Sequence, residues 1–204
     1  MTNFLVEQFP DAIEVDGEIL DINTDFRIGL QIMADFESGE FDQEECAELM
    51  LKRLYIKLPE NRGPDFYLNA ILQATKFLNA GEDTPHDSDS KPRVFSFVKD
   101  AKYIYSAFSQ AHGIDLQKEE LHWWRFVTLF NDLGECTFNT LRYLRAKKAE
   151  GNISEHENKM IRDFGADFYL DTQDTEYVPD DDELEFISKL PMEDQKRYWE
   201  WRKK

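Results

Sequence analysis

The segment from Asp100 to Leu133 constrains the fold more than any other, because it contains two consecutive helical patterns separated by one glycine. In the first pattern, apolar residues recur at the spacing that lines one face of a helix. These residues are Phe97, Ala101, Ile104, Tyr105, Phe108 and Ala111. Gly113 comes after them and can adopt the left-handed conformation that ends a helix, and Asp115 is placed to cap the next helix. The sequence therefore predicts a helix, a tight turn and a second helix.

The second helical pattern is unusual because it has two apolar stripes. One stripe consists of Trp123, Phe126, Val127 and Phe130. Leu121 and Trp124 point about 60 to 100° away from it, given about 3.6 residues per turn. One stripe is enough for a core, so the other needs a second partner, either another layer of the same domain or another chain. Burial between layers is the usual position of large aromatic side chains, whereas a partner-binding surface would contain Leu121 and Trp124.

The chain is strongly acidic, with a formal net charge of -18 and a pI near 4.6. Binding to DNA, RNA or anionic membranes depends on Lys and Arg, so we expect neither nucleic acid nor membrane as a partner. The acidity is concentrated at the start, where residues 1–48 hold fourteen carboxylates and Arg27 as the one basic residue. Such a surface either keeps the protein in solution or binds a basic partner.

The cysteines and histidines do not form a metal-binding pattern. Cys46 and Cys136 each stand alone, which argues against a disulfide framework or a cysteine-based zinc site and fits a reducing cytoplasm. No pair of the four histidines has the spacing of metal ligands. We expect His122 to be packed or hydrogen-bonded beside the tryptophans.

Two acidic motifs partly resemble cation sites. Asp21, Asn23 and Asp25 match the first ligand positions of a calcium loop, but Phe26 and Ile32 stand where that loop needs Gly and Glu. Capping of the next helix is the better interpretation of these residues. The acidic run 180–183 lacks an organising turn, so no metal is expected there either.

The motifs of common enzyme sites are absent from the sequence. There is no G-x-S-x-G turn for a nucleophile, and the glycines are scattered singly instead of forming a phosphate-binding loop. We therefore expect no catalytic residue, no cofactor and no enzymatic activity.

Turn and cap signals divide the rest of the chain into short elements. Asp16-Gly17 between two apolar runs predicts a β-hairpin. Helices are predicted from Asp25 to Gly39, from a capping box at Asp42 and Glu45 to Leu58, from Pro64 to Gly81, over 137–149 with a basic cluster, and from a capping box at Ser154 and Glu157 to Phe164. The sequence predicts one helical domain over 1–170 with an acidic internal loop at 82–92, and an arm over 171–204 made of an acidic linker and a terminal amphipathic helix. The predicted fold class is mainly α with a small N-terminal hairpin.

Two stretches of the chain resemble the bacteriophage gene-product-fifteen family of siphophages and prophages. The first is FPDAIEVDGEILDINTDFRIGLQ near the start, and the second runs from Asp100 through the L-H-W-W motif at 121–124. The resemblance covers most of residues 9–170 and implies a product made between the major tail protein and the tape-measure protein. That position is typical of a tail assembly chaperone.

The resemblance therefore predicts a non-enzymatic protein of the host bacterial cytoplasm whose partner is the tape-measure protein or another tail protein. Self-association is a further alternative. Two other functions stay open at this point: a structural tail component retained in the virion, and an acidic mimic of nucleic acid that blocks a DNA-binding host protein.

Overall fold

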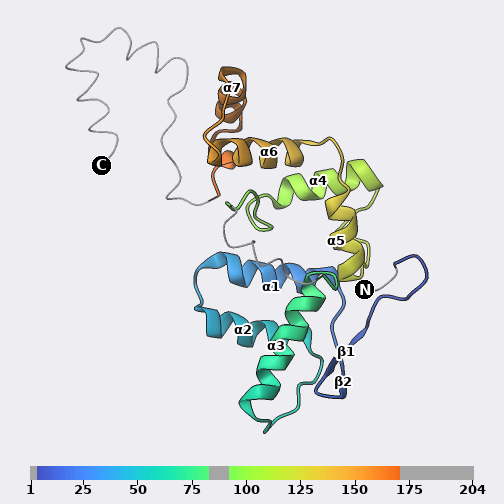
Figure 1. The fold of residues 1–204 in the computed structure, drawn as a ribbon. Coiled ribbons are helices and arrows are strands. Elements are labelled where there is room, and N and C mark those ends of the chain that lie inside the picture. Colours follow the sequence, from blue (N-terminus) through green and yellow to red (C-terminus); the bar gives the residue numbers. More distant parts are fainter. Residues whose placement is uncertain (1–3, 83–91, 171–204) are drawn as a thin grey trace, which may run out of the picture. The chain divides into compact units, whose positions relative to one another are not determined.

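A computed structural model describes residues 4–82 and 92–170 of the chain (Figure 1). The chain divides into two compact units, Met1–Thr140 and Leu141–Lys204. Within the described residues the first unit holds the β-hairpin and helices α1 to α5, and the second holds helix α7 and a 3-10 turn; helix α6 crosses the boundary. The mainly α fold with an N-terminal hairpin is thus confirmed. The arm predicted at 171–204 and most of the loop predicted at 82–92 lie outside the described residues, and the single domain over 1–170 stays a prediction.

The hairpin forms where Asp16-Gly17 predicts it. Strand β1 (Ala12–Val15) pairs antiparallel with β2 (Glu18–Asp21). Asp16 and Gly17 have positive φ values of 49° and 83°, as a two-residue turn of this kind requires. One face of the hairpin is buried, whereas Ile19 on the other face is 76% exposed. The inner face of the hairpin therefore packs in the core, and its outer face is exposed.

Helix α1 (Phe26–Ser38) begins at the cap residue Asp25, whose side chain accepts a hydrogen bond from the backbone N–H of Arg27. It ends at Gly39, which has a left-handed conformation. Helix α2 (Gln43–Leu54) begins with the predicted capping box of Asp42 and Glu45. These ends follow from local sequence because each cap is satisfied within a few residues.

The predicted end of α2 at Leu58 is wrong, since the helix stops at Leu54. The chain turns extended at Tyr55, which forms an isolated β-bridge with Ile22. The backbone N–H of Ile56 also donates to the Asp21 carbonyl. Pairing with the end of the hairpin thus replaces the last turn of helix.

Helix α3 (Pro64–Leu78) begins with Pro64 in its first turn and packs against α2 and β1. Helix α4 (Ala101–His112) ends at the left-handed Gly113, as predicted, and α5 (Trp123–Asn131) comes next. The core of the first unit is strongly aromatic around Phe126, which is fully buried. Its ring stacks on Phe108 at 4.9 Å and on Phe26 at 5.1 Å between centroids, which ties α1, α4 and α5 together.

The second unit is built on α7 and the turn after it. Helix α6 (Thr137–Ala149) leads to α7 (Glu155–Phe164), which starts with the predicted capping box of Ser154 and Glu157, and the 3-10 turn η2 (Gly165–Phe168) comes after it. Arg145 of the predicted basic cluster is buried and donates to the carbonyl oxygens of Phe168 and Asp167 at 2.6 and 2.7 Å. This arginine therefore has a structural position inside its unit.

Candidate partner-binding surface

The predicted partner-binding residues Leu121 and Trp124 are buried, with 3% and 4% of their surfaces exposed. Leu121 is not helical: its carbonyl accepts from the backbone N–H of Phe26, and the N–H of Trp123 donates to the Thr24 carbonyl. The segment before α5 thus runs beside the start of α1 as a short β-like bridge. Of the two alternatives that the sequence left open, another layer of the same domain describes this stripe, because other parts of the first unit cover both side chains.

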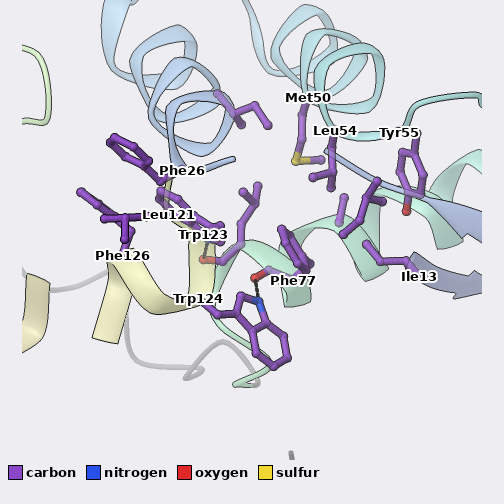
Figure 2. Close-up of a cluster of buried hydrophobic side chains, with 14 of the residues drawn as sticks. Ile13, Phe26, Met50, Leu54, Tyr55, Phe77, Leu121, Trp123, Trp124 and Phe126 are labelled. Carbon is purple, nitrogen blue, oxygen red and sulfur yellow. Dashed lines mark hydrogen bonds between the residues drawn. The ribbon is translucent and has the colours of Figure 1, made fainter. Parts of the chain in front are cut away.

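The two tryptophans bind the C-terminal end of α3 (Figure 2). The indole Nε1 of Trp124 donates to the Phe77 carbonyl at 2.8 Å, and that of Trp123 donates to the Leu78 carbonyl at 2.8 Å. The last carbonyls of a helix have no partner within the helix. The Leu78 carbonyl therefore gains a donor from outside the helix, and the Phe77 carbonyl accepts from the indole in addition to the backbone N–H of Ala80. The helix end in turn supplies acceptors for two buried indole N–H groups.

The N-terminal segment covers the outer side of Trp124. The Phe4 ring stacks on the Trp124 indole with centroids 5.5 Å apart, and Phe9 lies against both rings. Leu5 and Val6 beside it are 92% and 78% exposed. The second partner that the sequence required for this stripe is therefore α3 together with residues 4–9 of the same chain.

His122 is hydrogen-bonded beside the tryptophans, as predicted, but it also caps α5, a position that the sequence predicts for Asp115. Its ring Nδ1 accepts from the backbone N–H of Trp124 at 3.0 Å, and Nε2 lies 3.0 Å from the Pro10 carbonyl. This pair of contacts requires a neutral ring that is protonated on Nε2. Burial lowers the pKa of His122, although the Pro10 carbonyl and Asp11 act in the opposite direction.

Two recesses in the surface of the first unit lie next to the tryptophan pair. The first, the aromatic pocket, has a volume of about 640 Å³. It is lined mainly by apolar side chains from α1, α3, α5, the N-terminal segment and residues 95–97. The lining residues are Phe4, Met33, Leu78, Asn79, Ala80, Glu82, Phe95, Phe97, Trp123, Val127, Thr128, Phe130 and Asn131.

The second recess, the β1–α3 groove, has a volume of about 620 Å³ and contains Trp124 in its wall. Pro10, Ala12, Ile13 and Glu14 form one side, and Gln73, Lys76 and Phe77 of α3 form the other. The two recesses were not predicted from the sequence, because each is assembled from segments far apart in the chain.

The acidic motif at Asp21, Asn23 and Asp25 serves the fold. The Asn23 side chain donates to the Arg53 carbonyl at 2.8 Å, and Asp25 caps α1 and pairs with Arg27. This agrees with the capping interpretation. Among residues 4–82 and 92–170, no three His, Cys, Asp or Glu side chains are grouped as metal ligands, and the run at 180–183 lies outside that range.

A comparison with family models places this chain among phage proteins. The model described as Bacteriophage Gp15 protein matches residues 5–170, which is most of the chain. The chain therefore belongs to the Bacteriophage Gp15 protein family, as the resemblance predicted.

The other comparisons found no match, either among curated proteins or among solved structures. None of the helices in the described part of the chain combines the length and the apolar character needed to cross a membrane.

Proposed function

We propose that this protein is a non-enzymatic tail assembly chaperone that binds the tape-measure protein in the host cytoplasm before tail polymerisation. The observation that carries this proposal is membership of a bacteriophage protein family over residues 5–170. A tape-measure protein is expected to be long and helical with apolar stripes, so it aggregates unless those stripes are covered. An acidic chaperone keeps such a complex in solution through its net charge.

The aromatic pocket is the surface that we assign to this binding. A helix presents apolar side chains to a partner at alternating spacings of three and four residues, and it binds in a groove lined by apolar groups. The pocket has such a lining, with Phe97 and Val127 both half-buried. We do not assign Leu121 and Trp124 to this surface, because both are already buried and neither lines the pocket.

The experiment is co-expression with the tape-measure protein of the same phage genome, read as the soluble yield of that protein. Thr128 is exposed and lines the pocket, so Thr128→Trp fills the pocket with a ring and should lower the soluble yield. Arg125 is an exposed residue of the same helix that does not line the pocket. Arg125→Trp is therefore the matched control and should leave the yield unchanged.

The outcomes separate this function from the alternatives. Equal yields for Thr128→Trp and the wild type would show that the pocket is not the binding surface, and no effect of the wild type on solubility would refute the chaperone function. Presence of the protein in purified virions would instead support a structural tail component. Competition with DNA for a host protein would support the nucleic-acid mimic.

A further inference from the structure

The outer edge of strand β1 is unpaired. The N–H of Ile22 donates to the Asp11 carbonyl, and the two strands keep this register through the turn. Backbone groups alternate along an antiparallel strand, so Asp11, Ile13 and Val15 point toward β2 while Ala12 and Glu14 point away from it. Among the described residues, no backbone group is paired with those of Ala12 and Glu14. The edge therefore presents free donors and acceptors to another strand.

The other edge of the hairpin is used by the fold itself. Asp21 accepts from the N–H of Ile56, and Ile22 forms the bridge with Tyr55. Among the described residues, the β2 edge is thus partly occupied at Asp21 and Ile22, whereas the β1 edge has no backbone partner at Ala12 or Glu14. The β1 edge opens directly onto the β1–α3 groove, which Ala12, Ile13 and Glu14 line.

If a strand were added at this edge, every second side chain of that strand would point into the groove. Residues opposite each other in a sheet share a face. A residue opposite Ile13 would therefore point inward, toward Phe77 and Trp124 in the groove wall. Residues opposite Ala12 and Glu14 would point to the outer face, where Glu14 is exposed.

The charges at this edge indicate which kind of strand could bind there. Glu14 is exposed on the outer face of β1, and Asp11 is exposed just before the strand, while Glu82 and one basic residue, Lys76 of α3, line the groove. Pairing of two β1 edges from two copies would bring these carboxylates together, and like charges across a sheet are destabilising. A strand whose outward residues are basic would instead be attracted.

We propose that the β1 edge and the β1–α3 groove bind an extended peptide segment of a partner protein in which apolar and basic residues alternate. The segment adds a third strand to the hairpin through backbone hydrogen bonds to Ala12 and Glu14. Its apolar residues enter the groove and its basic residues lie beside Glu14 on the outer face. This inference goes beyond the proposed chaperone function, because it concerns a surface other than the aromatic pocket.

The test uses a fluorescent heptapeptide of alternating lysine and valine with the full-length protein, measured by fluorescence anisotropy. Two further peptides carry N-methyl groups on alternate amides, one on the lysine set and the other on the valine set. All three have the same charges and nearly the same composition. An added strand donates through only one of the two sets, so one methylated peptide should bind at least about tenfold more weakly and the other should bind like the parent.

Charge-driven binding without strand pairing gives a different result. Both methylated peptides would then bind equally well, and the proposal would be overturned. No binding of the parent peptide would overturn it as well. Because this comparison uses the wild-type protein, it does not depend on whether any variant folds.

Two substitutions test whether the peptide binds at the edge of β1. Ala12→Pro removes an outward N–H while leaving the pairing with β2 intact, since proline is accepted on strand edges. This variant should bind the parent peptide at least about tenfold more weakly, and its circular dichroism spectrum should be unchanged. Glu14→Lys should also weaken binding of the peptide. Glu40→Lys makes the same charge change on an exposed residue between α1 and α2, and it should have a much smaller effect on binding.

The peptide test and the chaperone test can fail separately. If Ala12→Pro loses peptide binding but still solubilises the tape-measure protein fully, the two surfaces bind different partners. Full peptide binding by Ala12→Pro would overturn the assignment to β1 and leave the chaperone function untouched.

Discussion

Gly29 of α1 lies directly against the indole of Trp123. A Cβ atom at position 29 would be 2.6 Å from Cδ2 of that ring and closer still to its neighbouring carbons. The indole cannot move aside easily, because it is buried and donates to the Leu78 carbonyl. The close approach of α1 and α5 therefore depends on the absence of a side chain at this position.

Gly29→Ala should destabilise the protein by about 2 kcal/mol, because overpacking costs up to about 3 kcal/mol and alanine gains only roughly 1 kcal/mol over glycine in a helix. Chemical denaturation measures the change. Gly63→Ala is the matched control: a Cβ there would meet nothing within 4 Å and φ is -68°, so it should cost less than about 1 kcal/mol as a change of cap residue. Similar losses for the two variants would contradict the packing argument.

The stability of the first unit should fall on mild acidification because of His122. Its pKa is lowered in the folded state, so protonation favours the unfolded chain. Stability is then fully present above the unfolded pKa of about 6.5 and is lost as the pH falls toward the lower folded value. Protonation of Nδ1 also removes the acceptor that caps Trp124.

Melting temperatures between pH 7.5 and pH 5 measure this effect. In His122→Asn the melting temperature should depend less on pH over this range, because asparagine keeps a capping oxygen and does not titrate. His156 is exposed, and His156→Asn should retain the wild-type dependence. A wild-type protein whose melting temperature is flat across this range would refute the prediction.

Glu157 should titrate far below an ordinary glutamate. Hydrogen bonds from the Ser154 hydroxyl and backbone N–H, and then from the Tyr143 hydroxyl, lower its pKa from 4.5 to about 2. The stability that this carboxylate contributes is present above pH 4.5 and is lost as the pH falls toward 2.

An NMR titration of the Glu157 carboxyl carbon gives its pKa directly. Ser154→Ala should move it toward 4.5 more than Tyr143→Phe does, because the serine is the larger cause. The opposite order would show that the tyrosine hydrogen bond dominates in the second unit.

Local signals were sufficient to predict the hairpin and most helix ends. Asp16-Gly17 and the two capping boxes each act within four residues, so one sequence contains the whole interaction. The end of α2 could not be predicted this way. Its cause is the pairing of Tyr55 with Ile22, which joins residues that are distant in the chain.

The candidate site was predicted less well for the same reason. Periodicity showed that Trp124 needs a second partner, but it could not distinguish another chain from a helix end of the same chain. The Phe77 carbonyl that binds the indole is 47 residues away, and no spacing rule connects the two. Gly29 was also missed, since a glycine inside a helix gives no sign of the ring that requires it.

The burial of Leu121 and Trp124 together with Phe126 changes what alanine substitutions should do. Phe126→Ala, Trp124→Ala and Leu121→Ala each remove a buried side chain, so each should destabilise the protein, by about 3 to 5 kcal/mol for the aromatic residues and about 2 to 5 kcal/mol for the leucine. Trp124→Phe separates packing from hydrogen bonding, because it keeps a ring but leaves the Phe77 carbonyl without its indole donor. We expect it to cost less than Trp124→Ala but at least about 1 kcal/mol. Denaturation curves for the four variants, with circular dichroism to confirm the fold, make the measurement. Leu121→Ala and Trp124→Ala could instead be as stable as the wild type and fail to keep the co-expressed tape-measure protein soluble. The second stripe would then be a partner surface, exposed in a conformation in which residues 4–9 and α3 have moved away from it.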